Sequence, residues 1–339
     1  MQTEATSPFL TEECQLQQQD SSAKDASRPG VGSVPSCLVC GRMRLGRIHR
    51  TPHQVLLRCK DCRLVFGWPV FSREALLEYN AISFRGQGFP ETAGYFDRSR
   101  VGLDGSSLLR QYRRGLEQIS RVVRAGRLLD VGCGVPIFLE LARSAGYAAQ
   151  GIDSVPEVAR IAREDFGLVV ETAPFDRSGL EKASFDVITM WDFLEHLPDP
   201  MDALMLSRQL LRPGGVLFVS VPNHRSVLHG VAALLGKLPY RRTLEMVDKL
   251  YHFSHVCIWS PRAIETALTR ARFSPLARGL DAPDLNRYRL QPAIRAGLTA
   301  IDVVGRITGL RSRLWILARP AASPSMDSPG FPPGVRSTG

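Results

Sequence analysis

Four cysteines near the N-terminus form two closely spaced pairs, and thiolates arranged in this way are ligands for a metal ion. Each pair has the form Cys-x-x-Cys, and the gap between the pairs falls within the range of about 15–20 residues found in zinc sites. Four thiolates complete the tetrahedral shell of zinc, so we expect a structural ion. The four predicted ligands are Cys37, Cys40, Cys59 and Cys62. The alternative is chance placement in a reduced core, which we favour for Cys14, Cys133 and Cys257.

Two acids and a histidine follow an apolar segment farther along the chain. They are Asp192, Glu195 and His196, and His252 or His255 could add a further ligand. Oxygen and nitrogen donors of this kind can bind a divalent cation such as Mg²⁺, which would lower the pKa of an acceptor hydroxyl. Two other interpretations stay open. His196 could act as a general base beside Glu195, or Glu195 could have a purely structural role.

A glycine-containing loop breaks a short apolar segment. Asp130 lies in that segment, and Gly132 and Gly134 follow it, where a tight turn and close approach of a ligand both favour glycine. Asp153 ends the next apolar segment and could accept hydrogen bonds from the hydroxyls of a ribose. Ile137 stands where the dinucleotide pattern requires its last glycine, so a nicotinamide dehydrogenase is disfavoured. A tight turn without a ligand is the remaining alternative.

Apolar segments and amphipathic segments alternate from residue 127 onward, which indicates a parallel sheet covered by helices. The expected strands are 127–132, 148–153, 168–172, 185–191, 216–221, 273–278 and 313–318. The expected helices are 108–123, 137–145, 156–165, 200–211, 261–270 and 293–308. A turn is expected at 213–215, where the sequence is Pro-Gly-Gly.

Composition limits the remaining possibilities. The net charge is +10, and a basic surface favours anionic partners such as nucleic acid, although an Arg-rich solvated surface explains the charge equally well. The sequence contains no secretory signal and no apolar stretch of about 20 residues, so we expect a cytoplasmic protein without a transmembrane segment.

The segment 127–223 resembles class I S-adenosylmethionine-dependent methyltransferases. The resemblance rests on the acid-x-Gly-x-Gly pattern ending at Gly134, on Trp191 to Pro200, and on Leu211 to Gly215, with Pro136 replacing the family's third glycine. It implies an α/β fold with a Rossmann-like, doubly wound, mostly parallel seven-stranded sheet, here preceded by the four-Cys zinc ribbon. It also implies S-adenosylmethionine as cofactor. The implied cofactor-binding residues are Asp130, Gly132, Cys133 through its backbone amide, Gly134, Asp153 and Trp191.

Two subfamilies bear on the acceptor. Ubiquinone-pathway and small-RNA 2′-O-methyltransferases carry a similar acid-x-x-Glu-His metal site, with Glu at the position of Asp192. The sequence after the second cysteine pair resembles ribbon-bearing methyltransferases of bacterial glycan and nucleotide-sugar pathways. We therefore expect methylation of a hydroxyl on a glycan, sugar nucleotide or lipid-like metabolite. An RNA methyltransferase that uses the ribbon and the basic surface, and a non-catalytic cofactor-binding scaffold, are the alternatives.

The chain divides into five predicted parts. They are a disordered tail at 1–35, the zinc ribbon at 36–69, a linker with amphipathic helices at 70–126, the methyltransferase domain at 127–319 and a disordered tail at 320–339. Within the methyltransferase domain, 224–255 is expected to be a lid over the acceptor. Its apolar portion, 227–238, could also touch a membrane surface peripherally.

Overall fold

A computed structural model describes residues 35–51, 53–85, 106–236, 250–252, 254–288 and 290–321 of the chain. The two predicted tails therefore lie almost wholly outside the described residues. Much of the predicted linker and the central part of the predicted lid also lie outside them. Among the residues described, no helix has the length and apolar character that crossing a bilayer requires.

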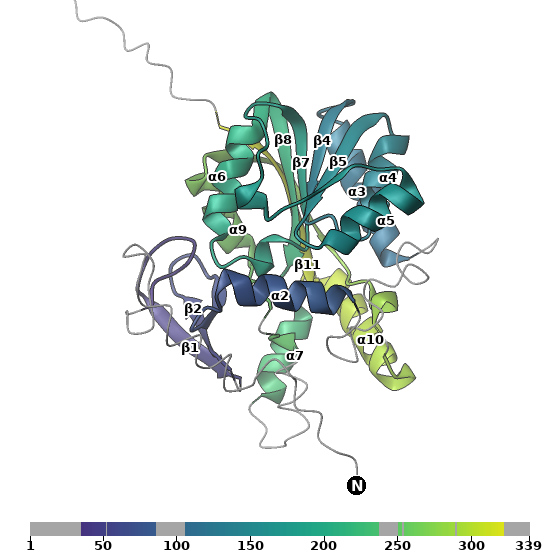
Figure 1. The fold of residues 1–339 in the computed structure, drawn as a ribbon. Helices are drawn as coiled ribbons and strands as arrows, with labels where there is room; N and C mark the ends of the chain where they lie inside the picture. The colour runs from purple at the N-terminus through teal and green to yellow at the C-terminus, as the bar shows by residue number, and fades with distance from the viewer. Residues whose placement is uncertain are drawn as a thin grey trace, which may run out of the picture.

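A seven-stranded sheet forms the centre of the molecule, in the order β10-β11-β8-β7-β4-β5-β6 (Figure 1). The strands from β8 to β6 pair in parallel, while β11 pairs antiparallel with both β8 and the edge strand β10. This arrangement confirms the predicted doubly wound, mostly parallel fold. The strands are β4 (Gly126–Val131), β5 (Tyr147–Asp153), β6 (Val170–Thr172), β7 (Phe185–Trp191), β8 (Leu211–Pro222), β10 (Phe273–Asp281) and β11 (Arg313–Pro320).

The turn predicted before the fifth strand is wrong. The turn expected at 213–215 lies inside β8, which begins at Leu211 and pairs that residue with Phe185. The register then shifts, and pairing resumes between Val216 and Val187. Gly214 takes up the irregularity with a φ of 85°, a conformation that glycine adopts without strain.

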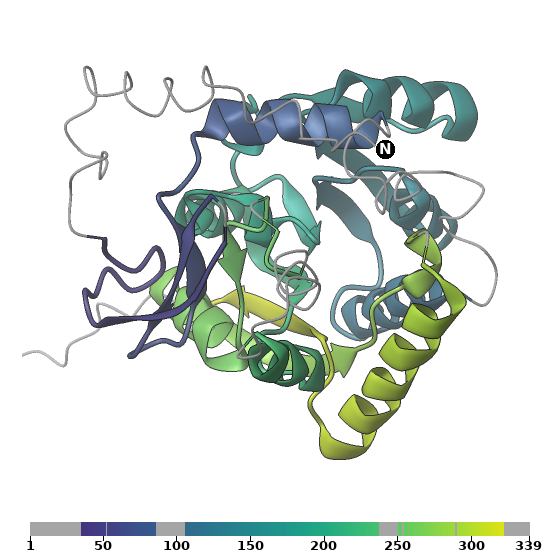
Figure 2. The ribbon, with the colours of Figure 1, turned by 90° about the horizontal axis from the view of Figure 1, so that it is seen from below.

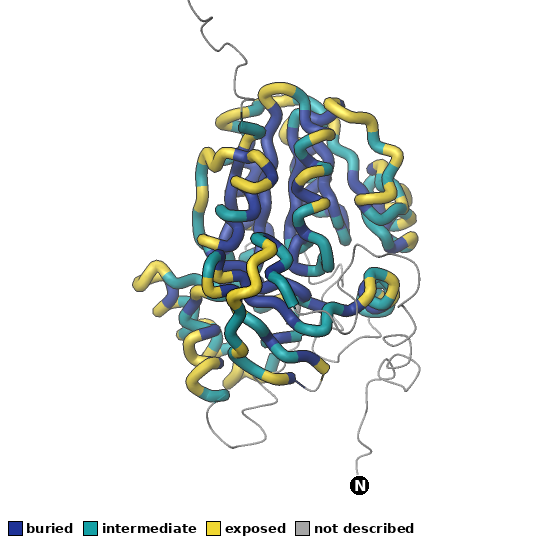
Figure 3. The backbone as a smooth tube through the Cα atoms, turned by 90° about the vertical axis from the view of Figure 1, so that its left-hand side faces the viewer, coloured by how far each residue is buried: buried dark blue, intermediate teal, exposed yellow. Residues whose placement is uncertain are grey.

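Helices cover both faces of the sheet, and each face has its own hydrophobic core. One face carries α3 (Ser107–Ser120), α4 (Ile137–Ser144) and α5 (Pro156–Phe166), and the other carries α6 (Pro200–Leu210) and α9 (Pro261–Arg270). The central strands are buried on both sides, whereas the outer faces of these helices are exposed (Figure 3). Strands enclosed in this way need near-continuous apolar sequence, which is why they were readily predicted.

A second, smaller sheet contains the cysteine pairs and has the order β1-β2-β3-β9. Its first three strands are β1 (Leu45–Arg50), β2 (Val55–Cys59) and β3 (Val65–Trp68). The fourth strand, β9 (Cys257–Ile258), follows the predicted lid in the sequence and pairs antiparallel with β3. The next residue, Trp259, bridges to Asn223 at the end of β8. Residues 257–259 thus join the small sheet to the large one.

Several helices lie at the carboxyl edge of the parallel strands. The helix α2 (Arg73–Phe84) crosses beneath this edge, and α7 (Val227–Leu235) and α10 (Pro292–Thr308) extend from it (Figure 1). Figure 2 looks along the same edge from below, with α2 and α10 on different sides of it. Ligands of open α/β sheets bind at this edge. The helix α7 forms the apolar part of the predicted lid, and its Leu234 is exposed.

Candidate functional site

The glycine loop follows β4 in a conformation that demands glycine. Gly132 and Gly134 have φ values of 68° and 51°. A Cβ atom on residue 132 would lie only 2.4 Å from the Phe193 ring. The loop backbone is therefore approached closely by an aromatic side chain that the sequence did not single out.

Asp153 stands at the end of β5 and faces this loop. Its carboxylate accepts hydrogen bonds from the backbone N–H groups of Gly134 at 3.0 Å and Val155 at 3.0 Å. Burial nevertheless raises the pKa of the carboxyl. A carboxylate has about four acceptor positions, so these backbone amides leave room for a further donor. This arrangement fits a hydroxyl of a ribose.

Asp130 is buried behind the loop, with 2% of its surface exposed. The Thr189 hydroxyl donates a hydrogen bond to it at 2.6 Å. Burial raises the pKa of Asp130 to about 7, and the neighbouring Asp153 contributes to the rise. The Cys133 side chain turns inward, where a Cβ on Gly151 would lie 2.7 Å from its sulfur. Cys133 therefore presents its backbone, and not its thiol, at the loop surface.

Trp191 lies among aromatic rings between α3 and the sheet. Its ring centroid is 4.8 Å from that of Tyr112, 5.2 Å from that of Phe138 and 4.7 Å from that of Phe218. Gly115 of α3 permits this packing, since a Cβ there would lie 2.5 Å from Trp191. The ring supports the floor of the site, and its predicted contact with the cofactor stays a prediction.

The second group of predicted residues is partly assembled. Ligand atoms of Glu195, His196 and His255 lie within 4.8 Å of one another. Glu195 is 1% exposed, and its Oε2 has no hydrogen-bond partner among the described residues. His196 Nδ1 lies 2.8 Å from the carbonyl oxygen of Ser254. Because a carbonyl only accepts, Nδ1 carries the proton and Nε2 of His196 keeps its lone pair.

Burial sets the protonation of this group. It lowers the pKa of His196, and it lowers the pKa of His255 together with repulsion from His196. Burial and the nearby Asp192 raise the pKa of Glu195. Both imidazoles are therefore neutral near pH 7, the form that can accept a proton or bind a metal ion.

Asp192 does not belong to the assembled group. Its backbone has a φ of 52°, and its carboxylate forms an ion pair with Arg313 at the start of β11. Arg313 also donates to the Ser220 hydroxyl at 3.2 Å. The predicted four-residue set of Asp192, Glu195, His196 and His255 is thus reduced to three, because a guanidinium 121 positions later in the chain holds the first acid.

His252, the other predicted ligand, contacts Ser254, the residue whose carbonyl binds His196. Its Nδ1 accepts hydrogen bonds from the Ser254 hydroxyl at 2.8 Å and from the Ser254 backbone N–H at 3.2 Å. Its Nε2 faces the Tyr79 hydroxyl on α2 at 3.4 Å. The loop that offers its carbonyl to His196 is held in this way by His252 and α2.

Comparison with known proteins identifies the family. Residues 106–277, just over half of the chain, match the family model described as methyltransferase domain. The chain belongs to this methyltransferase family. Its cofactor is S-adenosylmethionine, as the resemblance of the sequence implied.

The similar curated proteins act in quinone biosynthesis. The methyltransferase is 31% identical over 163 residues to the ubiquinone biosynthesis O-methyltransferase of Histophilus somni, which covers 44% of this chain and 68% of that protein. It is 35% identical over 128 residues to the enzyme of the same name from Haemophilus ducreyi, which covers 33% of this chain and 54% of that protein. The chain therefore spans about two thirds of one relative and about half of the other.

A solved structure shares the fold. The phosphoethanolamine N-methyltransferase 2 of Haemonchus contortus, in complex with S-adenosylmethionine, matches 76% of this chain and 62% of its own with a TM-score of 0.50 and 15% identity.

The four predicted zinc ligands come together in the methyltransferase. The sulfurs of Cys37 and Cys62 are 3.4 Å apart, those of Cys40 and Cys59 are 3.6 Å apart, and all four lie within 4.8 Å of one another. Zinc–sulfur bonds of about 2.3 Å separate the corners of a tetrahedron by about 3.8 Å. The described thiols are free rather than in disulfides. The donor set therefore fits zinc.

Proposed function

We propose that this methyltransferase transfers the methyl group of S-adenosylmethionine to a hydroxyl of a small or medium acceptor, such as a glycan, a sugar nucleotide or a lipid-like metabolite. The observation that carries the proposal is the cluster of buried Glu195 with half-buried His196 and His255. A hydroxyl loses its proton when its oxygen is methylated, and a neutral imidazole can receive that proton. The similar proteins named O-methyltransferases support an oxygen acceptor.

The residues around the glycine loop fit the cofactor. Asp153 has acceptor capacity left for a ribose hydroxyl. Gly132 and Gly134 allow the backbone to approach the methionine portion, and Asp130 offers negative charge behind it. When bound, the cofactor supplies an electrophilic methyl carbon, and the electrons of its carbon–sulfur bond return to sulfur as the carbon–oxygen bond forms.

The acidic and histidine cluster can serve the acceptor in two ways. His196 can take the hydroxyl proton at Nε2, with Nδ1 held by the Ser254 carbonyl. Alternatively, Glu195, His196 and His255 can together hold a divalent cation such as Mg²⁺, whose charge lowers the pKa of a nearby hydroxyl. The Glu195 oxygen without a hydrogen-bond partner could bind the cation, which would displace the proton that burial favours on this carboxyl.

Zinc at the four cysteines is the second part of the proposal. A site closed by four thiolates is structural, and its position beside β9 suits it to fix the loop that carries His255 and Ser254.

The test uses the full chain, zinc-loaded, with S-adenosylmethionine and fractionated metabolites, and mass spectrometry to find methylated products. We expect H196A to lower kcat/KM about 10²- to 10⁴-fold while the Kd for the cofactor stays unchanged. The matched control H49A, on β1, should keep full activity. If chelation abolishes activity and Mg²⁺ restores it at constant zinc content, the cluster holds a divalent cation. If activity does not depend on Mg²⁺, His196 acts as the general base. Full activity in H196A would reject the cluster's role.

A further inference from the structure

A small hollow opens beside Asp192. Its polar lining includes Asp192, Arg313, Gln111 and Asp284, and Leu108 belongs to its apolar wall. The hollow lies at the carboxyl ends of β7 and β10 and against α3. Asp192 and Arg313, which line the hollow, are close enough to Glu195 to influence its pKa, so the hollow adjoins the cluster to which we assign the acceptor hydroxyl.

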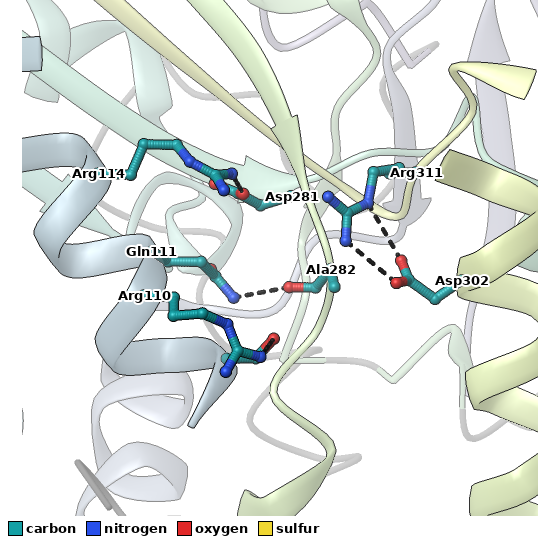
Figure 4. A network of polar contacts seen from close by, with 8 residues as sticks. Arg110, Gln111, Arg114, Asp281, Ala282, Asp302 and Arg311 are labelled. Atoms are coloured by element: carbon teal, nitrogen blue, oxygen red, sulfur yellow. Dashed lines mark hydrogen bonds and ion pairs between the residues drawn. The ribbon is translucent and has the colours of Figure 1, made fainter. Parts of the chain in front are cut away.

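Four carboxylates lie near this hollow, and three of them form an ion pair with an arginine. Arg114 pairs with Asp281, Arg313 pairs with Asp192, and Arg311 pairs with Asp302 at 3.1 Å. Figure 4 shows the first and third of these pairs on either side of the segment that follows β10. The remaining carboxylate is Asp284, which has no ion pair among the described residues.

Asp284 is buried without compensation. It is 6% exposed, and neither of its carboxylate oxygens has a hydrogen-bond partner in the described part of the chain. It precedes the short 3₁₀ turn Leu285–Arg287 but does not accept a hydrogen bond from it. A buried and unpaired carboxylate is costly to the folded protein, so its presence beside a hollow indicates a ligand that supplies donors.

The segment that carries Asp284 is held rigidly. The Gln111 side-chain amide donates to the Ala282 carbonyl at 2.6 Å, and Arg114 grips Asp281 one residue earlier (Figure 4). Both contacts come from α3, which also packs against the sheet. Asp284 is thereby held in position before any ligand arrives, which lowers the cost of binding.

We propose that Asp284 binds a vicinal diol of the methyl acceptor through both carboxylate oxygens. An ionised carboxylate only accepts hydrogen bonds, so two oxygens side by side match two neighbouring hydroxyls. The three guanidiniums nearby are each paired with another carboxylate, so Asp284 must take its hydrogen-bond donors from a ligand. Leu108 and Pro283 can cover the face of a ring. A sugar ring and an aromatic catechol both supply this chemistry. The inference rests on the proposed methyl transfer to a hydroxyl.

The experiment measures binding of four probes to the full chain loaded with S-adenosylhomocysteine, by nuclear magnetic resonance titration. Catechol and methyl mannopyranoside carry vicinal hydroxyls, whereas phenol and cyclohexanol carry one hydroxyl each. We expect one diol to bind at least tenfold more tightly than its single-hydroxyl counterpart, and the pair that shows this distinguishes the catechol from the sugar. D284N should remove the preference. The matched control D302N, whose carboxylate is ion-paired, should keep it.

Thermal unfolding supplies a second measurement that needs no acceptor. If Asp284 serves a ligand, D284N removes an uncompensated charge and raises the Tm of the unliganded protein by about 2 °C or more. If Asp284 is structural, D284N lowers the Tm. A lowered Tm, or equal binding of diols and single alcohols, or no binding of any diol, would overturn the inference. Absence of S-adenosylhomocysteine binding would instead refute the proposed function itself.

Discussion

Cofactor binding should depend on pH through Asp130. Burial raises the pKa of this carboxyl to about 7, so the unliganded protein holds it largely protonated at pH 6 and largely ionised at pH 8. The cofactor carries a sulfonium and an ammonium group, and both favour an ionised Asp130. Binding at pH 6 must therefore release a proton, and affinity should fall as the pH drops below 7.

The magnitude follows from the two protonation states. With a pKa of about 7, about one tenth of the unliganded protein is ionised at pH 6 and about nine tenths at pH 8. The Kd for S-adenosylmethionine should thus be about tenfold higher at pH 6 than at pH 8 on account of Asp130. The ammonium group of the cofactor titrates near pH 7.7–8.0 and has its own effect.

The variant D130N separates these contributions. It keeps Asp153 and Cys133, the titratable groups that face Asp130, and it keeps any titration of the ligand. Isothermal titration calorimetry from pH 6 to pH 8 gives the Kd of wild type and of D130N. The ratio of the wild-type Kd to the D130N Kd should be about tenfold higher at pH 6 than at pH 8. A ratio that stays constant over this range would refute the reasoning.

Stability offers an independent check on the same residue. A carboxyl whose folded pKa lies above its unfolded value stabilises the folded state fully below pH of about 3.9 and loses this contribution as the pH rises through 7. Wild type should therefore lose stability relative to D130N over this range, by a few kcal/mol at most, on the order of 1.4 kcal/mol per unit of pKa difference. Thermal unfolding of the unliganded proteins at pH 5 and pH 8 measures this loss.

Two further predictions concern the loop and the cysteines. The change G132A should abolish detectable cofactor binding and lower stability by roughly 2 kcal/mol, because residue 132 has a φ of 68° and its Cβ would strike Phe193. Unchanged calorimetric binding would contradict this, and G179A, where a Cβ has open space, is the matched control. The change C59S should remove zinc, measured by atomic absorption, and lower both Tm and activity. C257S, outside the cysteine cluster, should retain zinc, and full zinc content in C59S would exclude the assigned ligands.

Sequence patterns predicted the local features of this molecule well. The strands of the parallel sheet are apolar along their length, and the two cysteine pairs have metal-site spacing, so each could be read within a short window. Asp153 could be predicted as a ribose ligand because nucleotide-binding folds place an acid at the end of the second strand, about 20 residues after the glycine loop. The position of Phe193 could not be predicted, because an aromatic residue in the segment after β7 gives no sign that its ring will cover Gly132.

Other features depend on contacts between distant segments. The Asp192 carboxylate is paired with Arg313 of β11, two strands away from β7 in the sheet. The carbonyl that fixes His196 belongs to Ser254, and a contact made by a backbone group cannot be predicted from the residue type. Asp284 looked like an ordinary loop acid, and only its burial without a partner distinguishes it. No local pattern encodes such pairings.

The short strand β9 has a consequence for how the chain can be divided. It completes the small sheet through β3, and its neighbour Trp259 bridges to the end of β8. Cys37, Cys59 and Cys62 belong to the same hydrophobic core as α6 and α9. A shortened protein that begins after the ribbon would expose this core and leave an unpaired strand edge. We therefore expect that the N-terminal module cannot be removed or exchanged as an independent unit without aggregation of the remainder.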